Sequence, residues 1–155
     1  MPLDPQTYRQ YAYLSIRGKG PSKKISDALG IEPDEEWSEG DAWQAEGPHK
    51  QRWFTNWKLN SGVLDTEDLN VHVEAILRRV RSRELMLQAL TGDYDVRIVL
   101  VSYSLQNFSF ELDFQHQRRL TQLGIRMWFD AYIDEDVHRL MFDLRAQYGR
   151  AVFDT

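Results

Sequence analysis

Apolar and polar residues alternate along several short stretches of the chain, which is typical of strands that bury one face. Leu14 and Ile16 share one face of the first stretch, whereas Tyr13 and Ser15 share the other. The stretch over residues 96–103 is apolar on both faces, as expected of a central strand covered on two sides. The patterns predict five strands, over residues 11–17, 52–59, 96–103, 108–113 and 125–132.

Two details of these strands lead to specific expectations. Trp53 and Trp57 fall on the same face of the second strand by the period of two, so both are expected to point the same way. Gln106 and Asn107 form a plausible hairpin turn. Residues 108–113 are therefore expected to form a strand that leaves one face wet.

A period of three to four residues marks the helices. The longest is expected after an N-cap at Asp65 or Thr66 and extends to about residue 90, with a bend near Ser82. Shorter helices are expected over residues 22–29, 115–123 and 135–149. Gly30 and Gly124 end the first two of these, because glycine accepts the left-handed conformation of a helix C-cap. The apolar stripe of the longest helix consists of Leu69, Val73, Ile76, Leu77 and Val80.

These elements predict an α+β fold, with a mainly antiparallel sheet of about five strands and helices on one face, in the order β-α-β-α-β-β-α-β-α. A chain of 155 residues fits a single domain, expected over residues 1–155. Its core region spans about 11–133, and the C-terminal helix about 135–149. The residues expected in the core are Leu14, Ile16, Leu29, Trp57, Val73, Ile76, Leu77, Val80, Ile98, Leu100, Phe110, Leu123 and Phe129.

A weak internal repeat connects two parts of the chain. At an offset of 94 residues, Ile16 corresponds to Phe110, and residues 29–31 (Leu-Gly-Ile) are identical to residues 123–125. One interpretation is a duplicated strand–helix–strand unit, which would give a ferredoxin-like arrangement. The other is the independent use of a common helix-to-strand turn. The sequence alone leaves both open.

The negative charge of the chain is concentrated in one segment. Residues 32–41 hold six acidic residues and no Lys or Arg, while the rest of the chain has 18 acidic and 19 basic residues. A nucleic-acid-binding protein would be expected to show the reverse, so no nucleic-acid partner is expected. No apolar run approaches the roughly 20 residues of a membrane span. No membrane partner is expected, and the simplest location is the cytoplasm.

Several motifs together resemble a bacterial family known as domain of unknown function 4279. They include Tyr13-Leu14-Ser15-Ile16, Leu29-Gly30-Ile31 and Trp37-x-x-Gly40-Asp41. Later motifs follow in the same order: Trp57-Lys58-Leu59-Asn60-Ser61, His72, Leu120-x-x-Leu123-Gly124-Ile125 and Phe129-Asp130-x-Tyr132. The resemblance covers roughly residues 11–133 and implies no assigned activity. Some similar small domains lie near toxin systems and are suspected immunity proteins.

No catalytic constellation stands out in the sequence. None of the four histidines has the spacing of metal ligands, there is no cysteine, and no serine lies in a nucleophile elbow. We therefore assign no catalytic residue, no metal site and no cofactor. The sequence does not decide whether the protein is an enzyme, but it favours a protein that is not one.

The segment that combines carboxylates with tryptophans is the least ordinary feature of the chain. Its rings offer contact area, and its charges can steer a basic protein toward it. The leading hypothesis is therefore a non-catalytic protein-binding module, in particular an immunity-type inhibitor. A simpler role for Trp37 is to anchor the segment onto the core. The candidate partner-binding residues are Glu35, Glu36, Trp37, Glu39, Asp41 and Trp43.

A second hypothesis assigns the chain to a different class of proteins. The long connection over residues 32–51 could cover a pocket against the sheet, as connections of this length are often functional. The chain would then be a small-ligand-binding or enzymatic domain. The oligomeric state, the partner and any substrate are not determined by the sequence.

Overall fold

The computed structural model describes residues 7–43, 50–104 and 109–133. Its main feature is a five-stranded sheet with strand order β2-β5-β1-β6-β7. The three central strands pair antiparallel, and β7 pairs parallel to β6. The strands are β1 (Thr7–Gly18), β2 (Glu35–Trp37), β5 (Thr55–Asn60), β6 (Asp95–Ser104) and β7 (Arg126–Ile133).

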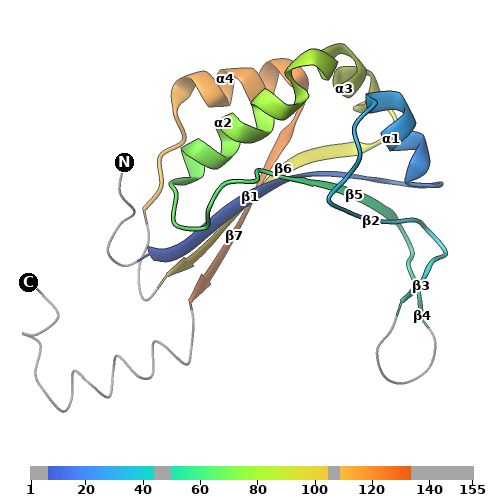
Figure 1. Ribbon diagram of the computed structural model, residues 1–155, viewed down its shortest axis with the longest axis horizontal. Coiled ribbons are helices and arrows are strands. Elements are labelled where there is room, and N and C mark those ends of the chain that lie inside the picture. Colours follow the sequence, from blue (N-terminus) through green and yellow to red (C-terminus); the bar gives the residue numbers. More distant parts are fainter. Residues whose placement is uncertain (1–6, 44–49, 105–108, 134–155) are drawn as a thin grey trace, which may run out of the picture.

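The helices lie together on one side of this sheet (Figure 1). A small hairpin, made of β3 (Ala42–Trp43) and β4 (Lys50–Gln51), extends from the corner near β2 and β5. None of the described helices is long and apolar enough to cross a membrane. The helical elements are α1 (Lys23–Leu29), α2 (Leu69–Val80), the 3₁₀ turn η1 (Arg81–Arg83), α3 (Glu84–Leu90) and α4 (Phe114–Leu123). An α+β fold with a mainly antiparallel sheet and helices on one face is thus confirmed.

The core lies between the sheet and the helices. Alternation in the strands supplies one side of it, since Leu14 and Ile16 of β1 and Ile98 and Leu100 of β6 are completely buried. Ten of the thirteen residues expected in the core are buried, while Leu77, Phe110 and Phe129 are partly buried and pack against it. Trp57 is the largest fully buried side chain, and its Nε1 donates to Ser26 Oγ of α1 at 3.0 Å.

The helix ends follow the signals read from the sequence. Gly30 and Gly124 adopt positive φ angles of 65° and 70° at the C-caps of α1 and α4, as predicted. The long helix bends where expected, because η1 separates α2 from α3. Its N-cap, however, is Asp68 rather than Asp65 or Thr66, and the Asp68 side chain accepts the N–H of Asn70.

The predicted strand over residues 108–113 is wrong. Residues 109–113 form no strand, because both edges of β6 are already paired, with β1 and with β7. Side chains satisfy the backbone groups instead: Asn70 Nδ2 donates to the Glu111 carbonyl, and Asn70 Oδ1 accepts the Asp113 N–H, both at 2.8 Å. Phe110 and Leu112 pack on the core from this irregular connection, so their alternation reflected burial rather than pairing. Residues 105–108, which include the expected turn and the first residue of the predicted strand, lie outside the described residues.

The internal repeat does not correspond to a duplicated strand–helix–strand unit in the described part of the chain. Its second copy lacks the first strand, and the following strands differ: β7 is parallel to its neighbour, whereas β2 is antiparallel to β5. What the two segments share is the glycine-capped helix end. The ferredoxin-like arrangement stays a prediction, and the helix expected over 135–149 lies outside the described residues.

The position of Trp53 also differs from the sequence prediction. It was expected to share a face with Trp57, but it is 76% exposed, because β5 begins only at Thr55. The backbone before Thr55 bonds to loops rather than to a strand. The Arg52 N–H donates to the Asp41 carbonyl at 2.8 Å, and Lys19 Nζ donates to the Trp53 carbonyl at 2.9 Å.

Burial distinguishes two neighbouring residues of α2. Ile76 is 1% exposed, whereas Leu77 lies at the margin of the core. We expect Ile76→Ala to lower the free energy of unfolding by about 2–5 kcal/mol, and Leu77→Ala to lower it by less, because a larger cavity forms at the fully buried site. Chemical denaturation of the two variants checks this order. Equal losses would contradict the described orientation of α2.

Candidate partner-binding surface

The sheet has a second face, opposite the helices, which we call the open face. In β1 the residues that alternate with Ala12, Leu14 and Ile16 point to it, among them Tyr11 and Tyr13. The register of the sheet places residues of the other strands beside them. No helix of the described residues covers this face (Figure 1).

A continuous layer of rings and cations crosses the open face from β2 to β7; we call it the aromatic band. Lys58 Nζ lies 5.2 Å from the ring centre of Trp37 and 5.0 Å from that of Tyr13. The Tyr11 ring centre is 6.4 Å from that of Tyr13 and 6.5 Å from that of Tyr103, and the Tyr103 and Tyr132 centres are 5.0 Å apart. The band consists of Trp37, Lys58, Tyr13, Tyr11, Tyr103 and Tyr132.

Two tyrosines of the band, Tyr11 and Tyr13, are held in their neutral form. Burial raises the pKa of Tyr11 to about 12, and the neighbouring Tyr103 contributes to this shift as the second-largest cause. Burial, followed by Asp130, also raises the pKa of Tyr13. Neutral phenols keep a hydrogen-bond donor as well as an apolar ring, a combination enriched in protein interfaces.

Cations on the open face are mostly matched by carboxylates. Lys58 Nζ lies 3.3 Å from Glu35 Oε2, and Arg97 forms an ion pair with Asp95. At the end of the band, Arg9 Nε lies 2.7 Å from Asp65 Oδ2. The band therefore carries little net charge, unlike a surface that binds a phosphate backbone. Tyrosine, tryptophan and arginine on such a surface are the residue types that dominate protein–protein binding energy.

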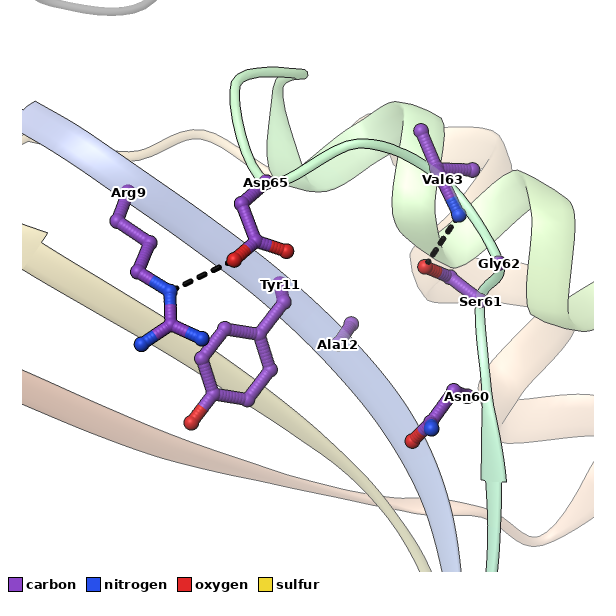
Figure 2. Close-up of a pocket in the computed structure, with 8 residues that line it drawn as sticks. All are labelled: Arg9, Tyr11, Ala12, Asn60, Ser61, Gly62, Val63 and Asp65. Carbon is purple, nitrogen blue, oxygen red and sulfur yellow. Dashed lines mark hydrogen bonds and ion pairs between the residues drawn. The ribbon is translucent and has the colours of Figure 1, made fainter. Parts of the chain in front are cut away.

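A pocket of about 550 Å³ lies at the end of the band, where β1 faces the loop between β5 and α2 (Figure 2). Arg9 and Tyr11 belong to its wall, and the ion pair between Arg9 and Asp65 spans one side. Both members of this pair are about half exposed, so the pocket is open to solvent. Its position next to the band allows it to receive a side chain from a bound partner. The remaining lining residues are Ala12, Asn60, Ser61, Gly62 and Val63.

A buried histidine supports the loop on the far side of this pocket. His72 is completely buried in α2, and its Nδ1 lies 2.6 Å from Ser61 Oγ. The same hydroxyl accepts the Val63 N–H at 3.2 Å (Figure 2), and Gly62 between them has a φ of 75°. The pair is therefore part of a tight turn that joins β5 to α2. His72 Nε2 is buried and has no hydrogen-bond partner among the described residues.

The segment predicted to bind a partner lies at the corner of the sheet beyond β5, and several of its carboxylates hold it in place. Asp41 Oδ2 accepts the Ser38 N–H at 2.7 Å. Glu39 accepts the Gly20 N–H at 3.2 Å and lies 3.4 Å from Lys19 Nζ. The Asp41 bond closes a turn within the segment, and the Glu39 bonds fasten the segment to the turn between β1 and α1.

The other predicted residues divide between the open face and solvent. Glu35 and Trp37 pair with Lys58 and Asn56 of β5, so Trp37 belongs to the aromatic band. Trp37 is partly buried and packs edge-on against Phe54 with ring centres 5.7 Å apart, in agreement with an anchoring role.

Glu36 and Trp43 extend away from this anchor. Glu36 is exposed, and its side chain has no hydrogen bond or ion pair with any described residue. Trp43, in β3, is 46% exposed, with Arg52 Cζ 5.0 Å from its ring centre. The structure thus brings Trp37 into the band, with Glu35 paired to Lys58 beside it, but leaves Glu36 and Trp43 at the corner.

Sequence reasoning missed most of the band. The signal was present in the alternation of β1, where Tyr11 and Tyr13 occupy the positions between core residues. Tyr103 and Tyr132 join them only through strand register, which the sequence does not specify. His72 was also missed as a core residue, because a polar residue on an apolar stripe carries no sign of its partner.

Comparison with known proteins yields one family. The model of the family described as domain of unknown function (DUF4279) matches residues 6–134, confirming the resemblance seen in the sequence motifs. No curated protein and no solved structure matches the chain. Among the described residues, no group of three or more His, Asp or Glu side chains could hold a metal ion.

Burial of His72 predicts a specific dependence of stability on pH. Burial lowers its pKa from the ordinary value of 6.5, although Asp65 acts in the opposite direction. The unfolded state therefore binds more protons just below pH 6.5, and stability that is complete above this pH is lost as the pH falls. The loss contributed by one such group is at most about 1.4 kcal/mol per pH unit.

Denaturation of the wild type and of His72→Gln between pH 5 and pH 7.5 measures this contribution (a range chosen around the ordinary histidine pKa). We expect the free energy of unfolding to fall less steeply with acid in the variant, whatever its stability at neutral pH. Parallel pH profiles would show that His72 does not titrate with a lowered pKa. His116→Gln serves as the control for loss of a histidine outside the core.

Proposed function

Since the chain belongs to the family described as domain of unknown function 4279, whose description states no activity, we propose from its surface that it is a non-catalytic protein-binding module. The partner lies on the aromatic band. The observation that supports this most is the position of four tyrosines in ring contact across three strands, on a face that no described helix covers. Rings fixed by one another lose little conformational entropy when a partner binds.

The band has the anatomy of a binding surface. Its centre is apolar and close to neutral, while charged pairs such as Arg9 with Asp65 lie at its end. Interfaces commonly combine a desolvated aromatic centre with a polar rim. The pocket beside Tyr11 supplies the concave feature that a partner's anchoring side chain needs.

The corner segment gives the surface its preference for a basic protein. Glu36 has no intramolecular partner among the described residues, and Trp43, in the hairpin that follows β2, is 46% exposed. A carboxylate without a described partner can attract a cation over a distance, and an exposed ring offers contact area. We accordingly include Glu35, Glu36, Trp37, Glu39, Asp41 and Trp43 in the proposed site, with Glu39 and Asp41 shaping the segment.

An immunity-type inhibitor of a basic toxin in the cytoplasm of a bacterium is the specific role that fits this proposal. Such proteins bind another protein without carrying out chemistry of their own. A toxin-like gene beside this one would support that role. Binding to an unrelated basic protein would preserve the module function and remove the inhibitor role.

The aromatic band is tested with a pair of exposed aromatic residues on opposite sides of the molecule. Tyr132, on the open face, and Phe114, in α4, are 47% and 70% exposed. We expect Tyr132→Ala to weaken binding of the partner at least about tenfold, as loss of an interface anchor does, and Phe114→Ala to leave it unchanged. The partner is isolated by affinity capture from the source cell and its affinity measured by calorimetry. Equal affinities for wild type and Tyr132→Ala would contradict docking on the band.

The role of the carboxylates is tested by comparing two neighbours. We expect Glu36→Gln to slow association with the partner at low salt and to leave the melting temperature unchanged, because this side chain bonds to none of the described residues. Glu39→Gln is expected to lower the melting temperature, since the amide has one acceptor oxygen for the two donors, the Gly20 N–H and Lys19 Nζ, and lacks the charge that attracts Lys19. The rate difference should fade near physiological salt, where the screening length is about 8 Å. An unchanged association rate at low salt would remove steering by Glu36.

A further inference from the structure

A second cleft, of about 350 Å³, lies at the opposite end of the open face, where β1 ends and β6 begins. Arg17 and Gly18 of β1 form one wall, and Asp95 and Arg97 of β6 form the next. Trp53 and Phe54, which follow the hairpin strand β4, close the cleft from the other side. Lys19 completes the lining.

The charge of this cleft is opposite to that of the whole chain. Three of its lining side chains are cations and one is a carboxylate, while the protein has a net charge of −5. Arg97 is paired with Asp95, and Lys19 Nζ lies 3.4 Å from Glu39 Oε1. Arg17 has no ion-pair partner within the described residues. The cleft therefore retains a cation that nothing described neutralises.

Buried polar atoms in the wall lack partners. Arg17 Nε and Arg97 Nε are both buried and donate to no acceptor in the described part of the chain. Asp95 Oδ1 is likewise buried and accepts from no donor there. Leaving such groups unpaired costs free energy, most of all for charged side chains. A ligand with an anionic group for the arginines and a hydroxyl or amino group for Asp95 would satisfy them.

The other wall of the cleft is aromatic and accessible. Trp53 is 76% exposed, and its ring packs edge-on against Phe54, with centres 4.7 Å apart. Arg17 Cζ lies 5.1 Å from the Phe54 ring centre, so guanidinium and rings are adjacent. An exposed indole held by a second ring offers its free surface for stacking by a flat ring.

We propose that this cleft binds a small organic anion that carries a flat ring. The anionic group, a phosphate or a carboxylate, contacts Arg17 and Lys19, and the ring stacks on Trp53. A hydroxyl or amino group of the ligand donates to Asp95. The volume lies at the lower end of the range for small-molecule sites, which suits a ligand the size of a mononucleotide. This site is independent of partner docking on the aromatic band, since it rests on different residues.

The experiment measures binding to the full chain by calorimetry with two probes of the proposed class, adenosine monophosphate and 2-naphthoate. Inorganic phosphate and adenosine serve as the two halves of the first probe. We expect at least one probe to bind saturably. Phosphate alone and adenosine alone should each bind at least about tenfold more weakly than adenosine monophosphate, because each forms only part of the contacts. Which probe binds identifies the preferred anionic group.

Two substitutions locate the binding. Arg17→Gln removes the cation that has no ion-pair partner among the described residues, and Trp53→Ala removes a ring that is 76% exposed. We expect each substitution to lower the affinity for the bound probe at least about tenfold. Arg126→Gln, which removes an exposed cation of β7 outside the cleft, should leave affinity unchanged.

Several outcomes would overturn the site. One is the absence of saturable binding of either probe up to about 5 mM, a concentration that detects even weak complexes. Another is unchanged affinity in Arg17→Gln, or in Trp53→Ala should Arg17→Gln fail to fold. Loss of probe binding in Arg126→Gln to the same extent would indicate general attraction of anions. None of these results bears on partner docking at the band, which Tyr132→Ala tests separately.

Discussion

The central position of β1 is the constraint on which the rest of the structure depends. This strand pairs with β6 along its length and with β5 from Tyr13 to Gly18, and on the remaining edge the Gln10 N–H donates to the Asp65 carbonyl. Its side chains then alternate between two different environments. Leu14 and Ile16 are fully buried under the helices, while Tyr11 and Tyr13 lie on the open face. One strand thus determines both the core and the candidate surface.

Hydrogen bonds of buried side chains fix the positions of the helices that apolar burial holds against the sheet. The Trp57 ring is buried in the core yet donates to Ser26 of α1, which orients that helix on the sheet. The hydrogen bond between Ser61 and His72 positions the start of α2 against β5, and Asn70 bonds to the connection that leads into α4. Buried polar groups require partners with defined geometry, so these few bonds specify how the helices sit where apolar contacts alone would permit several arrangements.

Most charged groups of the acidic segment stabilise loops, whereas the open face presents mainly aromatic rings to a partner. Most carboxylates of the acidic segment bond to nearby donors, which converts an apparent patch of negative charge into a set of loop contacts. On the open face, cations and carboxylates are paired, and the aromatic rings dominate. A surface of this kind supports binding through contact area and shape more than through long-range attraction. The cleft at Arg17 differs, because no carboxylate in the described part of the chain pairs with this cation.

The sequence by itself determined the class of fold, most of the core and both glycine caps, because periodicity and capping are local properties. It also held the alternation that points Tyr11 and Tyr13 away from the core. Only the tertiary structure decided that residues 109–113 form no strand, since that depends on both edges of β6 being occupied. It likewise decided that Tyr103 meets both Tyr11 and Tyr132, that Glu39 bonds to the turn at Gly20, and that no described carboxylate pairs with Arg17. Each of these depends on strand register or on contacts between segments distant in the chain, which no local pattern encodes.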